Sequence, residues 1–289
     1  MKKWGFFIFV VLLLGYAGIL TTEYFQERQD KENTLDGYEQ QRFSLGNSKM
    51  IKIVPQDQVY KGDLLLVNKD YPVHEEGVKS DIVNLAEHTE LTQGYGLPGH
   101  NIYLSKHVAQ AFKSMVKAAG KEGVNHFVIS SGYRDFEKQE ELYRDKGSAY
   151  ALPAGYSEHN LGLSLDIGST ETEMSQADEG KWLQENAWKY GFILRYPKDK
   201  AELTGIQYEP WHFRYVGLPH SAIMQEKDLV LEQYCDFLKE KKNLSAVVEG
   251  EEYNVSYYSM SQNILKVPEN GRYNISGNNT NGIIVTVKK

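Results

Sequence analysis

The sequence predicts an α+β fold: a small antiparallel sheet with flanking helices, preceded by a membrane anchor and followed by a small β appendage. Three observations lead to this prediction. Short strand-like segments in the middle of the chain alternate with segments of helical periodicity. A long apolar run occupies the N-terminus, and the last part of the chain contains only short β-rich runs.

The N-terminal segment is expected to cross a membrane. Lys2 and Lys3 precede an uninterrupted apolar run from Trp4 to Leu20, and these seventeen residues span about 26 Å as a helix, enough for a thin bilayer. Basic residues before the run and acidic residues after it place the bulk of the chain outside. A cleaved signal peptide is the alternative, but no Ala-x-Ala site follows, so we expect an uncleaved single-pass anchor at 1–22.

Residues 23–49 are polar and are expected to form a flexible tether. The main domain is predicted at 50–242. Two short strands, Met50–Val54 and Leu64–Val67, are expected near its start because both are rich in aliphatic residues.

The next elements are predicted from their periodicity. Apolar residues recur on one face of a helix from Lys106 to Glu122, and His126–Ser130 follows as a strand. Asp135 is a helix N-cap candidate, and its helix is expected to end at about Lys146.

Further along, we expect a helix over Glu179–Tyr190, a strand over Phe192–Tyr196 and one long helix from Pro219 to about Lys242. Cys235 lies on the apolar face of that last helix and is expected in the core. As the only cysteine, it excludes a disulfide framework and a cysteine-based metal cluster. Short strand-like runs separated by Asn, Gly and Pro then predict a β appendage at 245–289, whose role the sequence does not reveal.

The stretch from Ser157 to Asp166 predicts a metal site on the sheet. Its leucines alternate with small or polar residues, as in a half-buried strand, and it contains two candidate ligands, His159 and Asp166. A third candidate, His212, begins another strand-like run. Two imidazoles and one carboxylate suit one zinc ion, and three protein ligands leave the fourth position for water, as in catalytic zinc sites. The alternative is a surface or core histidine and an ion-paired aspartate.

Glu209 lies three residues before His212 and is expected to act as the general base, since a carboxylate beside such a metal can take a proton from water. His220, eight residues after His212, is a weaker ligand candidate because a Gly-Leu-Pro turn intervenes. Serine nucleophile chemistry at Ser157 is not expected, because zinc leaves no separate histidine and acid for a triad.

Arg134 ends a predicted strand and could hold a carboxylate through two parallel hydrogen bonds. An ion pair with a neighbouring acidic residue explains it equally well from composition alone. The formal net charge of −7 argues against nucleic acid as a partner.

These motifs resemble those of the VanY-type zinc D-Ala-D-Ala carboxypeptidases and dipeptidases. Ser157-x-His159-x-x-Gly162-x-Ser164-x-Asp166 and Glu209-x-x-His212 are similar to the two zinc motifs of that family. Ser-Gly-Tyr-Arg at 131–134, followed by Gln139, is similar to its substrate segment. The resemblance covers about residues 60–240.

The resemblance implies a peptidase with one zinc ion per chain, held by His159, Asp166 and His212. It implies that Glu209 and Arg134 are catalytic and that Arg134, Gln139 and Ser157 contact the substrate. For Gln139 a solvated helix position, and for Ser157 a local backbone cap, remain alternatives.

By the same resemblance, the substrates are peptidoglycan precursor peptides ending in D-Ala-D-Ala. Removal of the last D-Ala removes the target of vancomycin and so contributes to vancomycin resistance. We expect a monomer anchored in the cell membrane with its catalytic domain on the cell-wall side. A non-catalytic wall-binding module is the rival, and an L,D-carboxypeptidase, a dipeptidase or an endopeptidase would carry the same zinc motifs.

Overall fold

The computed structural model describes residues 47–147 and 151–289, which belong to one compact unit beginning at Leu45. The predicted anchor at 1–22 and nearly all of the predicted tether lie outside the described residues. Within the described ranges, no helix has the length and apolar character needed to cross a bilayer. The anchor therefore remains a prediction.

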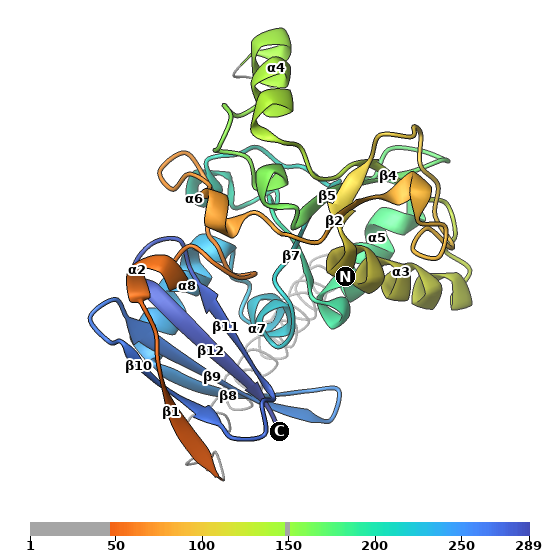
Figure 1. Ribbon diagram of the computed structural model, residues 1–289. Helices are drawn as coiled ribbons and strands as arrows, with labels where there is room; N and C mark the ends of the chain where they lie inside the picture. Colours follow the sequence, from red (N-terminus) through yellow and green to blue (C-terminus); the bar gives the residue numbers. More distant parts are fainter. Residues whose placement is uncertain (1–46, 148–150) are drawn as a thin grey trace, which may run out of the picture. The chain divides into compact units, whose positions relative to one another are not determined.

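The predicted antiparallel sheet is present and lies in the middle of the chain (Figure 1). Its four strands follow the order β4 (Phe127–Ser131), β5 (Ser164–Ser169), β7 (His212–Tyr215) and β6 (Phe192–Leu194). Every neighbouring pair is antiparallel, which confirms the α+β prediction for this part of the chain.

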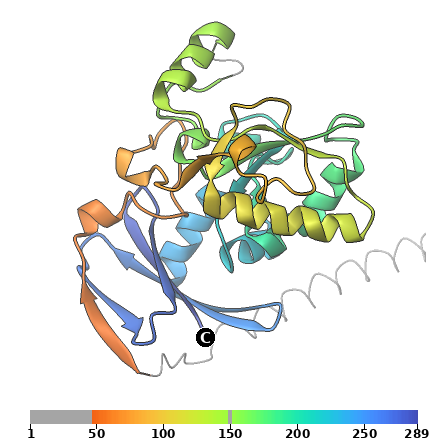
Figure 2. The same cartoon turned by 45° about the vertical axis from the view of Figure 1, so that its right-hand side comes forward.

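Helix α3 (Lys106–Lys121) packs on this sheet and appears in yellow in Figure 2. The core that it shares with the sheet contains Leu163, Leu165 and Ile167, each fully buried. The buried face of the helix consists of the six residues that its periodicity predicts: Val108, Ala109, Phe112, Met115, Val116 and Ala119.

Two further helices also follow the prediction. Asp135 caps α4 (Phe136–Lys146), because its Oδ1 accepts a hydrogen bond from the Lys138 backbone N–H at 2.7 Å. Helix α5 (Asp178–Asn186) continues as the 3₁₀ helix η4 (Ala187–Tyr190). The remaining short elements are α2 (Pro55–Gln58), η1 (Glu75–Gly77), β2 (Ile82–Asn84), η2 (Leu85–Glu87), β3 (Tyr103–Ser105) and α6 (Ala201–Thr204).

The prediction of a strand at Leu64–Val67 is wrong. The segment is buried but joins no sheet. Its backbone groups are satisfied by distant partners instead: the Leu66 N–H donates to the Asn278 carbonyl, and the Leu66 carbonyl accepts from Asn279 Nδ2. A buried backbone needs hydrogen bonds, but a strand partner is only one way to provide them.

The prediction of one long helix from Pro219 to Lys242 is also wrong. Two helices, α7 (His220–Glu226) and α8 (Leu231–Lys241), are separated by Asp228, whose φ of +50° is left-handed. Lys200 Nζ donates to the Asp228 carboxylate at 2.6 Å and to its carbonyl at 3.1 Å, which holds the break. No Gly or Pro marks it in the sequence.

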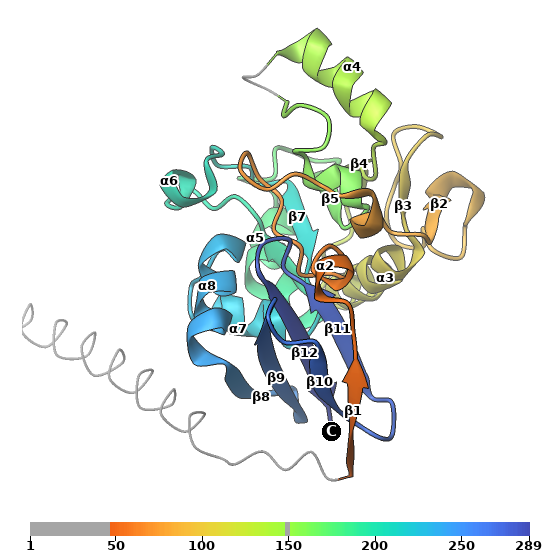
Figure 3. The same cartoon turned by 60° about the vertical axis from the view of Figure 1, so that its left-hand side comes forward.

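The C-terminal segment forms the sheet β11 (Tyr273–Gly277), β12 (Gly282–Lys288), β9 (Glu251–Ser259) and β8 (Asn243–Val248). A second pair joins β10 (Ile264–Pro268) to β1 (Ser48–Lys52), and the two lie side by side in Figure 3. The strand predicted at the start of the main domain therefore pairs with the predicted appendage.

The C-terminal sheet shares its core with the helices before it. Leu66, Ile223 and Leu231 form one buried cluster with Val255 and Ile284. Cys235 belongs to the same cluster, which confirms its predicted place in the core. The β-rich segment is thus part of one compact unit with the sheet that carries the motifs.

Candidate active site

Strand register brings the predicted ligands together. Asp166 on β5 is the direct partner of His212, the first residue of β7. His159 lies in the 3₁₀ helix η3 (Glu158–Leu161), just before β5. All three side chains line one pocket of about 540 Å³, together with Glu209 and Arg134.

The backbone before β5 turns where we predicted a continuous strand. Ser157 Oγ accepts a hydrogen bond from the His159 N–H at 3.3 Å and so begins the single turn of η3. Gly162 ends it with a φ of +80°, and a Cβ there would lie 2.3 Å from Ile82 Cδ1. This turn carries His159 out of the strand and toward Asp166.

The three ligand groups have the geometry of a metal site, since one donor atom from each lies within 4.8 Å of the others. Asp166 Oδ1 is 3.4 Å from His159 Nε2 and 3.2 Å from His212 Nδ1. The same oxygen is buried without a hydrogen-bond donor. An orphaned buried acceptor is costly, and a cation between the three atoms would satisfy it. Two histidines and one aspartate fit zinc.

The second nitrogen of each imidazole has its own acceptor. His159 Nδ1 donates to the Gly132 carbonyl at 2.6 Å, and His212 Nε2 donates to Glu158 Oε2 at 3.3 Å. These bonds assign the lone pairs to the nitrogens that face Asp166. Only glycine fits at position 132, because a Cβ would lie 2.2 Å from the Tyr103 carbonyl oxygen.

Burial and charge separate the pKa values of the two carboxyl groups. Burial alone would raise the pKa of Asp166, but the His159 and His212 imidazoles outweigh it and hold that pKa far below its usual range. Burial raises the pKa of Glu209, and the Asp166 charge adds to this against opposition from His212. Asp166 therefore stays anionic, whereas Glu209 has the more readily protonated carboxylate.

Burial and the Arg134 charge lower the pKa of His159. For His212, burial also disfavours the charged ring, but without a bound cation the Asp166 and Glu158 carboxylates beside its two nitrogens outweigh it and raise the pKa to about 9. Glu209 Oε2 lies 3.8 Å from His212 Nδ1, so the predicted base stands at the edge of the metal site.

Arg134 is held by the residue that we expected to contact the substrate. Its Nε donates to Gln139 Oε1 at 2.8 Å and its Nη1 to Ser131 Oγ at 2.5 Å. Gln139 Nε2 in turn donates to the Leu152 carbonyl at 2.6 Å. Gln139 is only 1% exposed, so the alternative of a solvated helix position is wrong.

Among the described residues, no ion pair joins Arg134 to the acidic residues that follow it, and Nη2 has no hydrogen bond. Arg134 lines the pocket that holds the metal ligands. The interpretation of Arg134 as a local ion-pair residue is therefore not supported by its contacts.

Comparison with known proteins gives the family. Residues 101–218 match the family model VanY, described as D-alanyl-D-alanine carboxypeptidase. A D-alanyl-D-alanine carboxypeptidase of Enterococcus faecium is 56% identical over 292 residues, which cover 99% of this chain and 96% of that protein. The chain belongs to the VanY family. It is a zinc-dependent D-Ala-D-Ala carboxypeptidase, and its His-Asp-His donor set fits that cofactor.

Two other VanY-type relatives extend the comparison. The bifunctional D-Ala-D-Ala dipeptidase and carboxypeptidase VanXYC of Enterococcus gallinarum is 37% identical, over 61% of this chain and 94% of its own. The crystal structure of the D,D-dipeptidase VanXYg with a D-Ala-D-Ala phosphinate analogue superposes with a TM-score of 0.73 at 33% identity, over 84% of this chain and all of that one.

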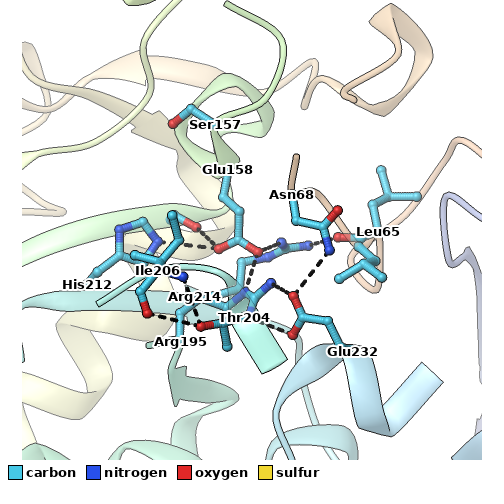
Figure 4. Close-up of polar contacts among 12 residues, drawn as sticks. Leu65, Asn68, Ser157, Glu158, Arg195, Thr204, Ile206, His212, Arg214 and Glu232 are labelled. Carbon is cyan, nitrogen blue, oxygen red and sulfur yellow. Dashed lines mark hydrogen bonds and ion pairs between the residues drawn. The ribbon is translucent and has the colours of Figure 1, made fainter. Parts of the chain in front are cut away.

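In this VanY-family enzyme the sequence analysis missed Glu158, although it lies next to His159. Its side chain is fully buried, and Oε1 accepts hydrogen bonds from Arg195 Nε at 2.8 Å and Arg214 Nη1 at 2.7 Å (Figure 4). Oε2 accepts from Ser164 Oγ and His212 Nε2. The available signal was two arginines among apolar residues, Arg195 directly after β6 and Arg214 within β7, because buried arginines need a buried anion.

Trp211, next to the ligand candidate His212, lines the pocket with 43% of its surface exposed. His220 is not near the metal ligands: its Nδ1 contacts the Tyr234 hydroxyl at 2.7 Å and its Nε2 the Thr286 hydroxyl at 2.8 Å. It joins α7, α8 and β12.

Proposed function

We propose that this protein is a membrane-anchored zinc D,D-carboxypeptidase. It removes the C-terminal D-Ala from peptidoglycan pentapeptide stems ending in D-Ala-D-Ala, on the cell-wall side, and so contributes to vancomycin resistance. The observation that carries the proposal is the meeting of His159, Asp166 and His212 with Glu209 and Arg134 in one open pocket.

The chain's own groups perform the proton and charge steps. When bound, zinc supplies a Lewis acid that acidifies water and polarises the scissile carbonyl. Glu209, whose pKa is raised, accepts a proton as water adds to the carbonyl carbon. As the C–N bond breaks, Glu209 delivers that proton to the amine of the leaving D-Ala.

Arg134 binds an anionic group of the substrate, either its terminal carboxylate or the oxyanion that develops at the carbonyl. Gln139 orients the guanidinium through its 2.8 Å hydrogen bond and is itself held by Leu152. Ser157 lines the same pocket and can donate to the substrate carboxylate.

A dipeptidase is the second candidate. It is favoured by the likeness to VanXYg, a D,D-dipeptidase whose whole chain this one covers, and to the bifunctional VanXYC. The two functions share the zinc chemistry and differ only in whether the pocket accepts a peptide N-terminal to D-Ala-D-Ala.

The test measures D-Ala release by the full chain in detergent with zinc, from an acylated peptide ending in D-Ala-D-Ala, from free D-Ala-D-Ala and from a tetrapeptide stem. We expect the acylated peptide to be the best substrate by at least tenfold in kcat/KM. Preference for the free dipeptide would establish the second candidate, and activity on the tetrapeptide alone would refute both.

The membrane location has its own test. The run from Trp4 to Leu20, flanked by Lys2 and Lys3, supports an anchor with the rest of the chain outside. We expect the full chain to stay in membranes after alkaline carbonate extraction and to be digested by protease added to protoplasts. Release by carbonate, or protection from the protease, would contradict this location.

A further inference from the structure

A line of buried charged side chains leads from the metal site to helix α8 (Figure 4). It begins at His212 Nε2, which donates to Glu158 Oε2 at 3.3 Å. Glu158 Oε1 accepts from Arg195 Nε at 2.8 Å. The other two nitrogens of Arg195 form a fork on Glu232 of α8, with distances of 2.9 and 2.7 Å.

These groups have been removed from water at considerable cost. The side chains of Glu158, Arg195 and Arg214 are 0% exposed, and that of Glu232 is 16% exposed. Burying each ion costs several kcal/mol, and a well-packed apolar cluster is often at least as stable as a buried ion pair. Stability alone therefore does not explain four buried charges at this place. The fixed orientation that they impose on the His212 ring does explain them.

The orientation matters because His212 must present one particular nitrogen. Its Nδ1 faces Asp166 only while Nε2 keeps its proton and its acceptor. Glu158 is a suitable acceptor as long as its other oxygen is held. Arg214 holds that oxygen while its Nη2 is bound to the Asp63 and Leu65 carbonyls.

Arg195 holds the same oxygen, but its guanidinium needs an anchor of its own. Two nitrogens of the planar guanidinium donate to the two oxygens of Glu232. A lysine ammonium in place of the arginine, or a side chain with one acceptor oxygen in place of the glutamate, cannot reproduce this geometry. Asn68 Nδ2 also donates to Glu232 Oε1, at 3.3 Å. The carboxylate on α8 is thus fixed from two sides.

We propose that Arg195 and Glu232 are positioning residues of the metal centre, which act through Glu158 to hold His212 in its metal-binding orientation. Helix α8, which leads into the C-terminal sheet, is then part of the catalytic apparatus. The proposal rests on the metal centre and not on the identity of the substrate, so failure of the proposed substrate assignment would leave it standing.

The experiment replaces Glu232 by Gln in the full chain, which keeps the side-chain size but removes the charge and one acceptor. Glu240→Gln is the matched control, because Glu240 lies on the same helix and is exposed. Two measurements report on the metal site without any substrate: the zinc dissociation constant by chelator competition, and the visible absorption spectrum of the cobalt(II)-substituted protein.

We expect Glu232→Gln to weaken zinc binding by at least threefold and to change the cobalt spectrum, with lower kcat and an unchanged KM. Mutation of a residue that contacts a metal ligand directly usually lowers metal affinity or activity by about 10- to 100-fold. Glu232 contacts His212 only through Arg195 and Glu158, so we expect a smaller effect. Arg195→Lys is expected to behave in the same way, since it keeps the charge but loses the fork. Glu240→Gln should match the wild type.

A purely structural role for Glu232 makes a different prediction. It would lower the unfolding midpoint while the folded protein kept its zinc affinity within threefold and its cobalt spectrum unchanged, and that result would overturn the proposal. If circular dichroism shows that Glu232→Gln does not fold, Glu232→Asp carries the test, because it retains the charge and is too short to keep both bonds.

Discussion

The buried ring of His220 should make the stability of this enzyme depend on pH. The ring is 4% exposed and bridges the hydroxyls of Tyr234 and Thr286, so it ties α7 to α8 and to the C-terminal sheet. Burial lowers the pKa of His220 to about 3, although the Asp63 charge acts in the opposite direction. In the unfolded chain, a histidine has a pKa of about 6.5.

The sign of the effect follows from these two values. Between pH 6.5 and 3 the unfolded chain binds a proton at His220 that the folded protein does not, so the free energy of unfolding falls as the pH falls. Each pH unit in this window costs about 1.4 kcal/mol. Going from pH 7.5 to 5 should therefore remove about 2 kcal/mol of stability through this one ring.

The assay compares wild type with His220→Gln by denaturant unfolding of the zinc-loaded full chain at pH 7.5 and 5.0. We expect the stability advantage of the wild type to shrink by about 2 kcal/mol at the lower pH, because glutamine does not titrate. An advantage that is the same at both pH values would refute the reasoning.

Three further predictions concern the pocket. Glu209→Gln should reduce kcat by about 100- to 10,000-fold and keep zinc affinity within twofold, as measured by steady-state kinetics and chelator competition; near-normal turnover would identify another base. Arg134→Lys should raise KM at least tenfold if the guanidinium holds the terminal carboxylate, or lower kcat if it holds the oxyanion, and unaltered kinetics would remove it from the site. His212→Ala should abolish zinc binding in equilibrium dialysis, whereas His107→Ala should retain one ion per chain; retention by the first variant would exclude His212 as a ligand.

Much of the site was predictable because its metal ligands lie in short sequence motifs. The residue types of His159, Asp166 and His212 indicated a zinc site, and strand alternation placed Asp166 on the face away from the leucines. The helices α3 and α4 were equally predictable, because periodicity and a capping aspartate are properties of neighbouring residues. The sequence predicted that Asp166 and His212 bind the same zinc ion, and the pairing of β5 with β7 places these two residues opposite each other.

What the sequence could not reveal depends on partners that are far away along the chain. Leu66 lies beside Asn278 and Asn279, so its backbone needs no strand. Gln139 is buried because it holds Arg134, and no periodicity distinguishes it from an exposed helix residue.

Glu158 illustrates the division most clearly. By itself the sequence determined which residues have the donor atoms for a catalytic zinc ion and which segments alternate as strands, because donor type and periodicity are local. Only the tertiary structure decided that the glutamate beside His159 lies between Arg195 and Arg214, in contact with His212. The physical reason is that a buried charge persists only with its partners, and here β7 and the residue directly after β6 bring those partners together.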